Sequence, residues 1–346
     1  MKKILFVFSI VVLLAAGCNK SQQTGSQSSA SVNTKSASTS ISSNKDYKKV
    51  ISLNFDRGNG AQQLGAISSI YTDNNNNLYL LDFQNDKVVS LNSEGKQLSV
   101  IKTEKMSTIA VDDNGNIYGS GAGSLPDGMG GILEYNNQGK LLSKVDNSSA
   151  FSATGDSEAD GVLFIAGNTL YSKTLLNVSY AISPIGASLK TGATKIDGIY
   201  GMSGKRYKIR VNFTPHTGSV DKPISFDQLA YLDIFDKSGQ VKTTTLKIHN
   251  LVEIRFLGED QAGNFYLFTS LYTPPANDPN FPYPTNYAQV RKFDASGNQL
   301  ATIDVSIPQG YSGMFTTGLH VDQAGNVWQA IGNDKKMLIE KWSTAY

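Results

Sequence analysis

Short apolar runs separated by Gly- and Asn-rich turns recur along the chain after residue 45. In each repeat an apolar run ends at a turn of the form Asp-x-x-Gly/Asn-Asn. A second apolar run follows, with an aromatic residue at its second position. Glycine and asparagine adopt the positive φ of tight turns at low cost, so the pattern predicts β-hairpins. The clearest examples span Ile67–Asp82, Ile109–Tyr118, Phe256–Tyr266 and Gly318–Trp328.

A second type of hairpin, with a Gly near its turn, follows the first type along the chain. Two hairpins in tandem predict a four-stranded sheet, and repeats of roughly 40–50 residues built in this way are typical of propeller blades. Two weaker units, Val162–Tyr171 and Ile199–Ile209, bring the number of predicted blades to six. The second hairpins span Val88–Leu98, Leu133–Leu142, Asp233–Val241 and Arg291–Leu300.

The two ends of the repeat region complement each other. The last unit ends at Met337–Trp342 with no strand after it, whereas the first unit follows a spare apolar strand, Val50–Phe55. The simplest arrangement places this spare strand at the outer edge of the last blade, which closes the ring and removes an exposed sheet edge. The sequence therefore predicts an all-β domain over residues 46–346, a six-bladed propeller closed by its N-terminal strand.

These motifs resemble the NHL repeat. The resemblance is good in four units and weaker in the other two, and it implies a propeller fold. NHL proteins include bacterial surface sensors, protein- and RNA-binding platforms and a few lyases, so the resemblance does not specify a function. In the first unit the matching residues are Asp73, Asn77, Leu78, Tyr79, Asp82, Asn85, Val88 and Gly95.

The N-terminus has the layout of an export signal. Lys2 and Lys3 precede an apolar run, Ile4–Leu14, which is too short to span a bilayer stably as a helix. The small residues before Cys18 resemble the lipobox of bacterial lipoproteins. The resemblance implies that residues 1–17 form a signal peptide that is removed. It also implies that diacylglycerol on the sulfur of Cys18 anchors the protein to the extracytoplasmic side of a membrane, as a cell-surface or periplasmic component.

Residues 18–45 follow as a predicted tether. They are rich in Ser, Thr, Gln and Asn and lack Leu, Phe, Tyr and Trp, so they cannot bury enough apolar surface to order themselves. A flexible chain of this length reaches about 30 Å. Without the two basic residues of the signal peptide, the 31 basic residues of the chain become 29, which balances the 29 acidic ones. This neutral charge argues against nucleic acid as a partner.

Few residues are candidates for catalysis or metal binding. Cys18 is the only cysteine, so disulfides, metal thiolates and thiol catalysis are not expected. Of the three histidines, His216, His249 and His320, only the last occupies a strand position that faces a propeller's centre, whereas a zinc lyase needs several. The sequence therefore predicts no metal and no cofactor.

Two of the predicted hairpin turns carry oxygen ligands at the spacing of calcium loops. These are Asp73-x-Asn75-x-Asn77 and Asp112-x-Asn114-x-Asn116. However, the equivalent turns that begin at Asp260 and Asp322 have alanine at the third position. A role in forming the turn explains all four, and calcium binding stays an alternative.

A long insertion, Leu271–Tyr287, separates two strands of the fifth unit. Five prolines stiffen it, and long loops in compact domains are often functional. Its aromatic residues form a candidate binding loop; the alternative is that the rings pack against the adjoining blade. These residues are Tyr272, Phe281, Tyr283 and Tyr287.

The leading interpretation is a membrane-anchored binding module whose partner is an extracytoplasmic protein, peptide or glycan. A rigid scaffold on a flexible tether, without a recognisable catalytic set, favours this interpretation. One alternative is a propeller lyase or hydrolase that uses carboxylates and His320 in the central channel. Another is a structural lipoprotein of the cell envelope.

Overall fold

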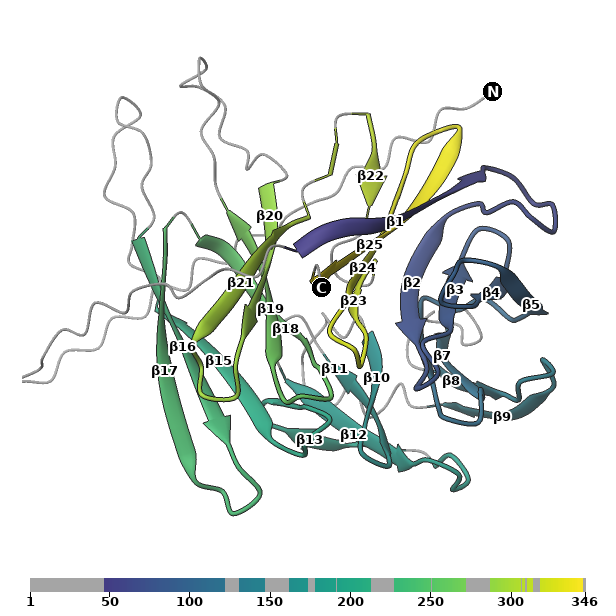
Figure 1. The fold of residues 1–346 in the computed structure, drawn as a ribbon. Coiled ribbons are helices and arrows are strands. Elements are labelled where there is room, and N and C mark those ends of the chain that lie inside the picture. The colour runs from purple at the N-terminus through teal and green to yellow at the C-terminus, as the bar shows by residue number, and fades with distance from the viewer. Residues whose placement is uncertain are drawn as a thin grey trace, which may run out of the picture. The chain divides into compact units, whose positions relative to one another are not determined.

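The computed structural model describes residues 47–121, 131–146, 162–173, 178–190, 192–212, 227–249, 251–271, 287–305, 307–308, 310–313 and 318–344. All of them belong to one compact unit. They form six antiparallel sheets, and no helix among them could cross a membrane. The predicted all-β, six-bladed propeller is confirmed (Figure 1).

In the first three blades the strands follow one another in sequence order from the innermost to the outermost. Blade 1 contains β2 (Ile67–Thr72), β3 (Leu78–Asp82), β4 (Lys87–Leu91) and β5 (Gln97–Lys102). Blade 2 contains β6 (Thr108–Val111), β7 (Ile117–Gly121), β8 (Gly131–Tyr135) and β9 (Leu141–Asp146). Blade 3 contains β10 (Val162–Ala166), β11 (Thr169–Lys173), β12 (Ser179–Pro184) and β13 (Thr194–Ile196).

Blades 4 and 5 repeat this order, and the last blade departs from it. Blade 4 contains β14 (Ile199–Tyr200), β15 (Arg206–Asn212), β16 (Asp227–Phe235) and β17 (Val241–His249). Blade 5 contains β18 (Leu251–Glu259), β19 (Phe265–Leu271), β20 (Tyr287–Phe293) and β21 (Gln299–Asp304). Blade 6 contains β1 (Tyr47–Asp56), β22 (Ser312–Gly313), β23 (Leu319–Val321), β24 (Val327–Gly332) and β25 (Lys336–Thr344).

The spare N-terminal strand closes the ring as predicted. β1 pairs antiparallel with β25 at the outer edge of blade 6, from Tyr47 opposite Thr344 to Asp56 opposite Lys336. The observed strand is longer at both ends than the predicted one, Val50–Phe55. Its half-buried residues Ile51, Leu53 and Phe55 alternate with more exposed ones and pack against the apolar cluster between blades 6 and 1. One face of β1 therefore contributes to the core.

One aspartate organises the first turn of each of four blades. In blade 1, Asp73 Oδ1 accepts hydrogen bonds from the backbone N–H groups of Asn75 and Asn77, both at 2.9 Å. Its Oδ2 accepts from Asn77 Nδ2 at 2.9 Å and from the Tyr79 hydroxyl at 3.2 Å. Both carboxylate oxygens are thus occupied within their own hairpin, which explains the recurring Asp, Asn and aromatic positions. The other three aspartates are Asp112, Asp260 and Asp322.

Blade 4 lacks this aspartate, and a glutamate of the neighbouring blade 5 takes over its hydrogen bond. Gly201 occupies the equivalent position, with the same backbone turn bonds. The Tyr207 hydroxyl donates instead to Glu259 Oε1 of blade 5 at 2.8 Å, and the same carboxylate accepts from the Ser203 backbone N–H at 2.8 Å. A Cβ at position 201 would lie 2.3 Å from Glu259 Oε2, so only glycine leaves room for this carboxylate.

The core lies between the blades rather than at the centre of the ring. Five clusters of buried apolar residues each join two successive blades. Among the described residues, the junction of blades 3 and 4 has no such cluster. Aromatic rings meet there instead: Tyr171 stacks on Phe164 at a centroid distance of 5.2 Å and contacts Tyr200 at 5.6 Å. This junction borders the central cavity.

Candidate functional site in the central cavity

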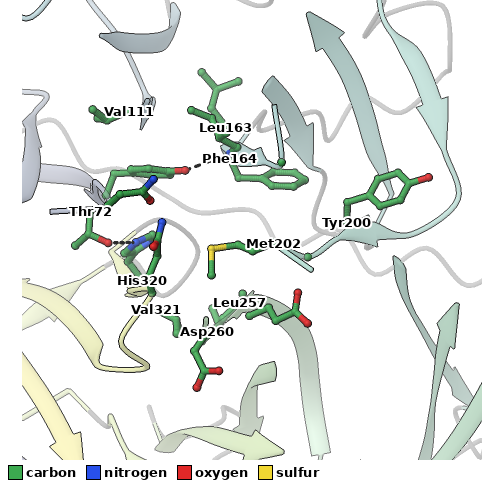
Figure 2. A pocket seen from close by; sticks show the side chains of 18 of the residues that line it. Thr72, Val111, Leu163, Phe164, Tyr200, Met202, Leu257, Asp260, His320 and Val321 are labelled. Carbon is green, nitrogen blue, oxygen red and sulfur yellow. Dashed lines mark hydrogen bonds between the residues drawn. The ribbon is translucent and has the colours of Figure 1, made fainter. Parts of the chain in front are cut away.

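A cavity of about 500 Å³ occupies the centre of the ring. Residues of the innermost strands of all six blades line it, together with Lys173 from the second strand of blade 3. Figure 2 shows the side chains of Phe164, Met202 and His320 converging on this space, whereas the carboxylate of Asp260 points away from it. The walls combine apolar and aromatic side chains with a similar share of polar groups.

Side chains from one blade hydrogen-bond to the inner edge of another. An innermost strand has no neighbour on its central side, so its backbone groups there need other partners. Ser69 Oγ accepts from the Ile109 N–H at 3.3 Å, and the Tyr71 hydroxyl accepts from the Ile165 N–H at 3.2 Å. The Tyr71 hydroxyl keeps its own proton as a donor, because none of the described residues accepts it.

Lys173 reaches from blade 3 to blade 5. The innermost strand of blade 4, β14, has only two residues, and the register of β18 shifts between Phe256 and Gly258. Lys173 Nζ donates to the carbonyl oxygens of Phe256 at 3.1 Å and Leu257 at 3.4 Å. Burial, and to a smaller extent the positive charge of Arg255, lowers the pKa of Lys173 to about 7. This lysine is therefore poised between its charged and neutral forms near neutral pH.

His320 lines the cavity on the opposite side, as its position in the repeat predicts. Its Nε2 lies 2.8 Å from Thr72 Oγ1, and its ring contacts that of Tyr71 at a centroid distance of 4.9 Å. Burial, with a smaller contribution from the charge of Lys173, lowers the pKa of His320 to about 3. The imidazole is neutral at physiological pH and acts as a polar but uncharged part of the wall.

The buried acidic residues that line the cavity are already engaged. Asp112 bonds within its own turn, and Glu259 binds Ser203 and Tyr207. Asp260 accepts from Tyr266 and pairs with Lys292 at 3.2 Å. Lys173, in contrast, has no carboxylate within ion-pair distance in the described part of the chain. When it is protonated, Lys173 is thus a cationic donor in the cavity wall, whose other charged side chains among the described residues are the carboxylates of Asp112, Asp113, Glu259 and Asp260.

Of the residues that the sequence analysis singled out, His320 lines the cavity, and the structure describes few of the others. Cys18, Tyr272, Phe281, Tyr283 and His216 fall outside the described residues, and so does the tether. Tyr287 begins β20, where its backbone pairs with Leu271, and His249 ends β17; the structure does not describe the side chain of either. Within the described ranges no group of three or more His, Cys, Asp or Glu side chains could hold a metal ion.

Lys173 is the residue that sequence reasoning missed. It follows Tyr171-Ser172 at the end of a strand in one of the two weak repeat units, where the pattern gives no alignment to the better units. A lysine at the end of a strand ordinarily extends into solvent. Its partners are backbone carbonyl groups of another blade, at Phe256 and Leu257, and this contact is not visible in the sequence.

Comparisons with known proteins do not assign the chain to a family. No family model matches the chain, and no curated protein matches its sequence. A member of the DUF4221 family from Bacteroides vulgatus is similar in structure, at 12% identity and a TM-score of 0.49 over 86% of this chain and 98% of that one.

Two further propellers are similar at the same level. The WD40 domain of Pan2 from Neurospora crassa shares 12% identity, with a TM-score of 0.44 over 88% of this chain and 98% of that one. Virginiamycin B lyase from Staphylococcus aureus shares 10% identity, with a TM-score of 0.40 over 87% of this chain and 100% of that one. At these identities and TM-scores the similarities carry no inference about the function of this chain.

Proposed function

We propose that this protein is a lipid-anchored, extracytoplasmic binding module that takes a small ligand, or a side chain of a larger partner, into its central cavity. The observation that carries the proposal is the cavity itself. Its volume of about 500 Å³ lies within the range of small-molecule sites, and its walls combine apolar and aromatic side chains with polar groups that can orient a ligand. These polar groups include Tyr71, Lys173 and His320.

The engaged acidic groups favour binding over the alternative of a propeller lyase or hydrolase. General acid–base catalysis most often uses a carboxylate or imidazole that is free to exchange a proton with the substrate, although a lysine with a lowered pKa can also serve. Asp112, Glu259 and Asp260 instead bond within or between blades, and His320 is held neutral beside Thr72. A purely structural envelope protein would not need a partly polar cavity.

Calorimetry on the full chain in detergent tests the proposal with three probes that share one aromatic body: phenylacetate, 2-phenylethanol and phenethylamine. We expect saturable binding of at least one probe. Gly258 provides a blocking variant, because it lines the cavity and a Cβ there would meet only Val321, at 3.7 Å. Gly258→Phe should abolish binding by filling the space, whereas the matched control Gly258→Ala should bind normally.

Two outcomes would refute a cavity ligand. One is that none of the three probes binds saturably. The other is that Gly258→Phe, with an unchanged melting temperature, binds a probe as well as the wild type does, because the probe would then occupy another place.

A further inference from the structure

We propose that the ligand of the central cavity carries a carboxylate group, and that the ammonium group of Lys173 binds it. The inference rests on the proposed function, since it specifies the chemical class that the same cavity accepts. It is drawn from the surroundings of Lys173: its hydrogen bonds, the missing counter-charge and the aromatic rings beside it.

The hydrogen bonds of Lys173 leave one donor free. An ammonium group has three N–H donors, and the carbonyl oxygens of Phe256 and Leu257 take two of them. None of the other described residues accepts the third. Lys173 lines the cavity, so a ligand inside it can supply the missing acceptor.

The charge of Lys173 also lacks a partner. Lys173 is half-buried in the cavity wall, where removing an unpaired ammonium group from water is costly. The cavity's buried carboxylates are committed elsewhere, and the nearby guanidinium of Arg255 pairs with Glu253 at 2.7 Å. Both His320, which is neutral, and Arg255, which is positive, leave the charge on Lys173 uncompensated. An anionic ligand would compensate it.

The walls next to Lys173 indicate what the rest of the ligand resembles. Nζ lies 5.8 Å from the centroid of the Phe164 ring, and Phe164 belongs to the row of rings that includes Tyr171 and Tyr200. Such a row suits an apolar or aromatic body attached to the carboxylate. The Tyr71 hydroxyl adds a hydrogen-bond donor elsewhere on the cavity wall.

The three probes separate this inference from the proposed function. Below the pKa of Lys173, at about 7, phenylacetate should bind about 10- to 100-fold more tightly than 2-phenylethanol, the usual contribution of a hydrogen bond to a charged group. Lys173→Met should reduce phenylacetate binding to the level of the alcohol. Lys173→Arg keeps the charge and should keep the preference, and the exposed Lys96→Met is the matched control.

Each outcome decides between the two proposals. Equal binding of phenylacetate and 2-phenylethanol, or a preference that survives in Lys173→Met, would overturn the carboxylate inference and leave the cavity as a binding site. Tighter binding of phenethylamine would do the same. Failure of all three probes would overturn both proposals.

A measurement on the wild type covers the case in which Lys173→Met does not fold. The affinity for phenylacetate should fall as the pH rises through about 7, because Lys173 loses its proton. The affinity for 2-phenylethanol should stay constant. A guanidinium group such as that of Arg255 stays protonated in proteins, and His320 stays neutral over this range. Parallel curves for the acid and the alcohol would therefore overturn the inference.

Discussion

At the scale of single residues, blade 4 has Gly201 where four other blades have an aspartate, and a residue of the next blade replaces the missing carboxylate. In the turns that begin with Asp, the carboxylate accepts a hydrogen bond from the aromatic residue of its own hairpin, as Asp112 Oδ2 does from the Tyr118 hydroxyl at 3.3 Å. In blade 4 the glycine removes that carboxylate, and Glu259 of blade 5 takes its place on Tyr207. The bond that stabilises one hairpin in other blades here joins two blades.

Gly201→Ala should therefore destabilise the protein. The added Cβ would lie 2.3 Å from Glu259 Oε2 and displace the carboxylate from Ser203 and Tyr207. We expect the free energy of unfolding, measured by chemical denaturation, to fall by about 1–3 kcal/mol, as is usual for overpacking. Gly258→Ala, with its nearest contact at 3.7 Å, is the matched control and should be tolerated. Equal stability of the two variants would contradict this account of blade 4.

His320 should make stability depend on pH. Its pKa is about 3 in the folded protein and 6.5 ordinarily, so between these values the unfolded chain binds a proton that the folded chain does not. The free energy of unfolding should then fall as the pH drops from 6.5 towards 3, by up to about 1.4 kcal/mol per pH unit from this residue. Denaturation of His320→Gln at several pH values should give a shallower slope.

Thr72→Val provides the control for His320. It removes the hydroxyl that lies 2.8 Å from His320 Nε2 but leaves the titrating ring in place. This variant should be less stable than the wild type and yet keep the same pH slope. If wild type and His320→Gln instead lose stability in parallel, the ring is not held neutral by the fold.

At the scale of elements, β1 is the strand on which closure depends. It covers the outer edge of β25 along its whole length and adds apolar side chains to the cluster between blades 6 and 1. Removing residues 1–45 leaves these contacts intact, so we expect a cooperatively melting protein. Removing residues 1–55 exposes the edge of β25, and we expect a lower melting temperature and aggregation in light scattering. Identical melting of the two truncations would show that closure does not depend on β1.

The sequence predicts the regular blades well because their turns have local causes. An aspartate that binds its own backbone, and a glycine with positive φ such as Gly95, leave signatures within a few residues. The pairing of β1 with β25 was also predictable, because the last repeat unit lacks an outer strand and the first unit follows a spare one. The role of Lys173 was not predictable, since its hydrogen-bond partners are backbone carbonyl groups of another blade.

At the scale of the whole molecule, the strand order gathers the tight Asp and Gly turns at one end of the sheets. The Asp and Gly turns join first to second and third to fourth strands. At the other end of the sheets the second strands end and the third strands begin, for example at Gly121 opposite Gly131 and at Leu271 opposite Tyr287. β1 begins at the end with the Asp turns, where the Tyr47 hydroxyl donates to the Gly325 carbonyl at 2.9 Å.

The proposed lipid anchor joins the propeller through this start of β1. Cys18 is the only thiol in the chain, so Cys18→Ser should abolish lipid labelling and move the protein from the membrane fraction to the soluble fraction. Each buried CH2 contributes about 0.8 kcal/mol, and two acyl chains anchor a protein far better than one, so the shift should be nearly complete. Ser26→Ala, a change within the predicted tether, is the control and should stay in the membrane fraction. Unchanged fractionation and labelling of Cys18→Ser would rule out the lipoprotein proposal, while the cavity and its expected ligand would be unaffected, because they depend only on the propeller.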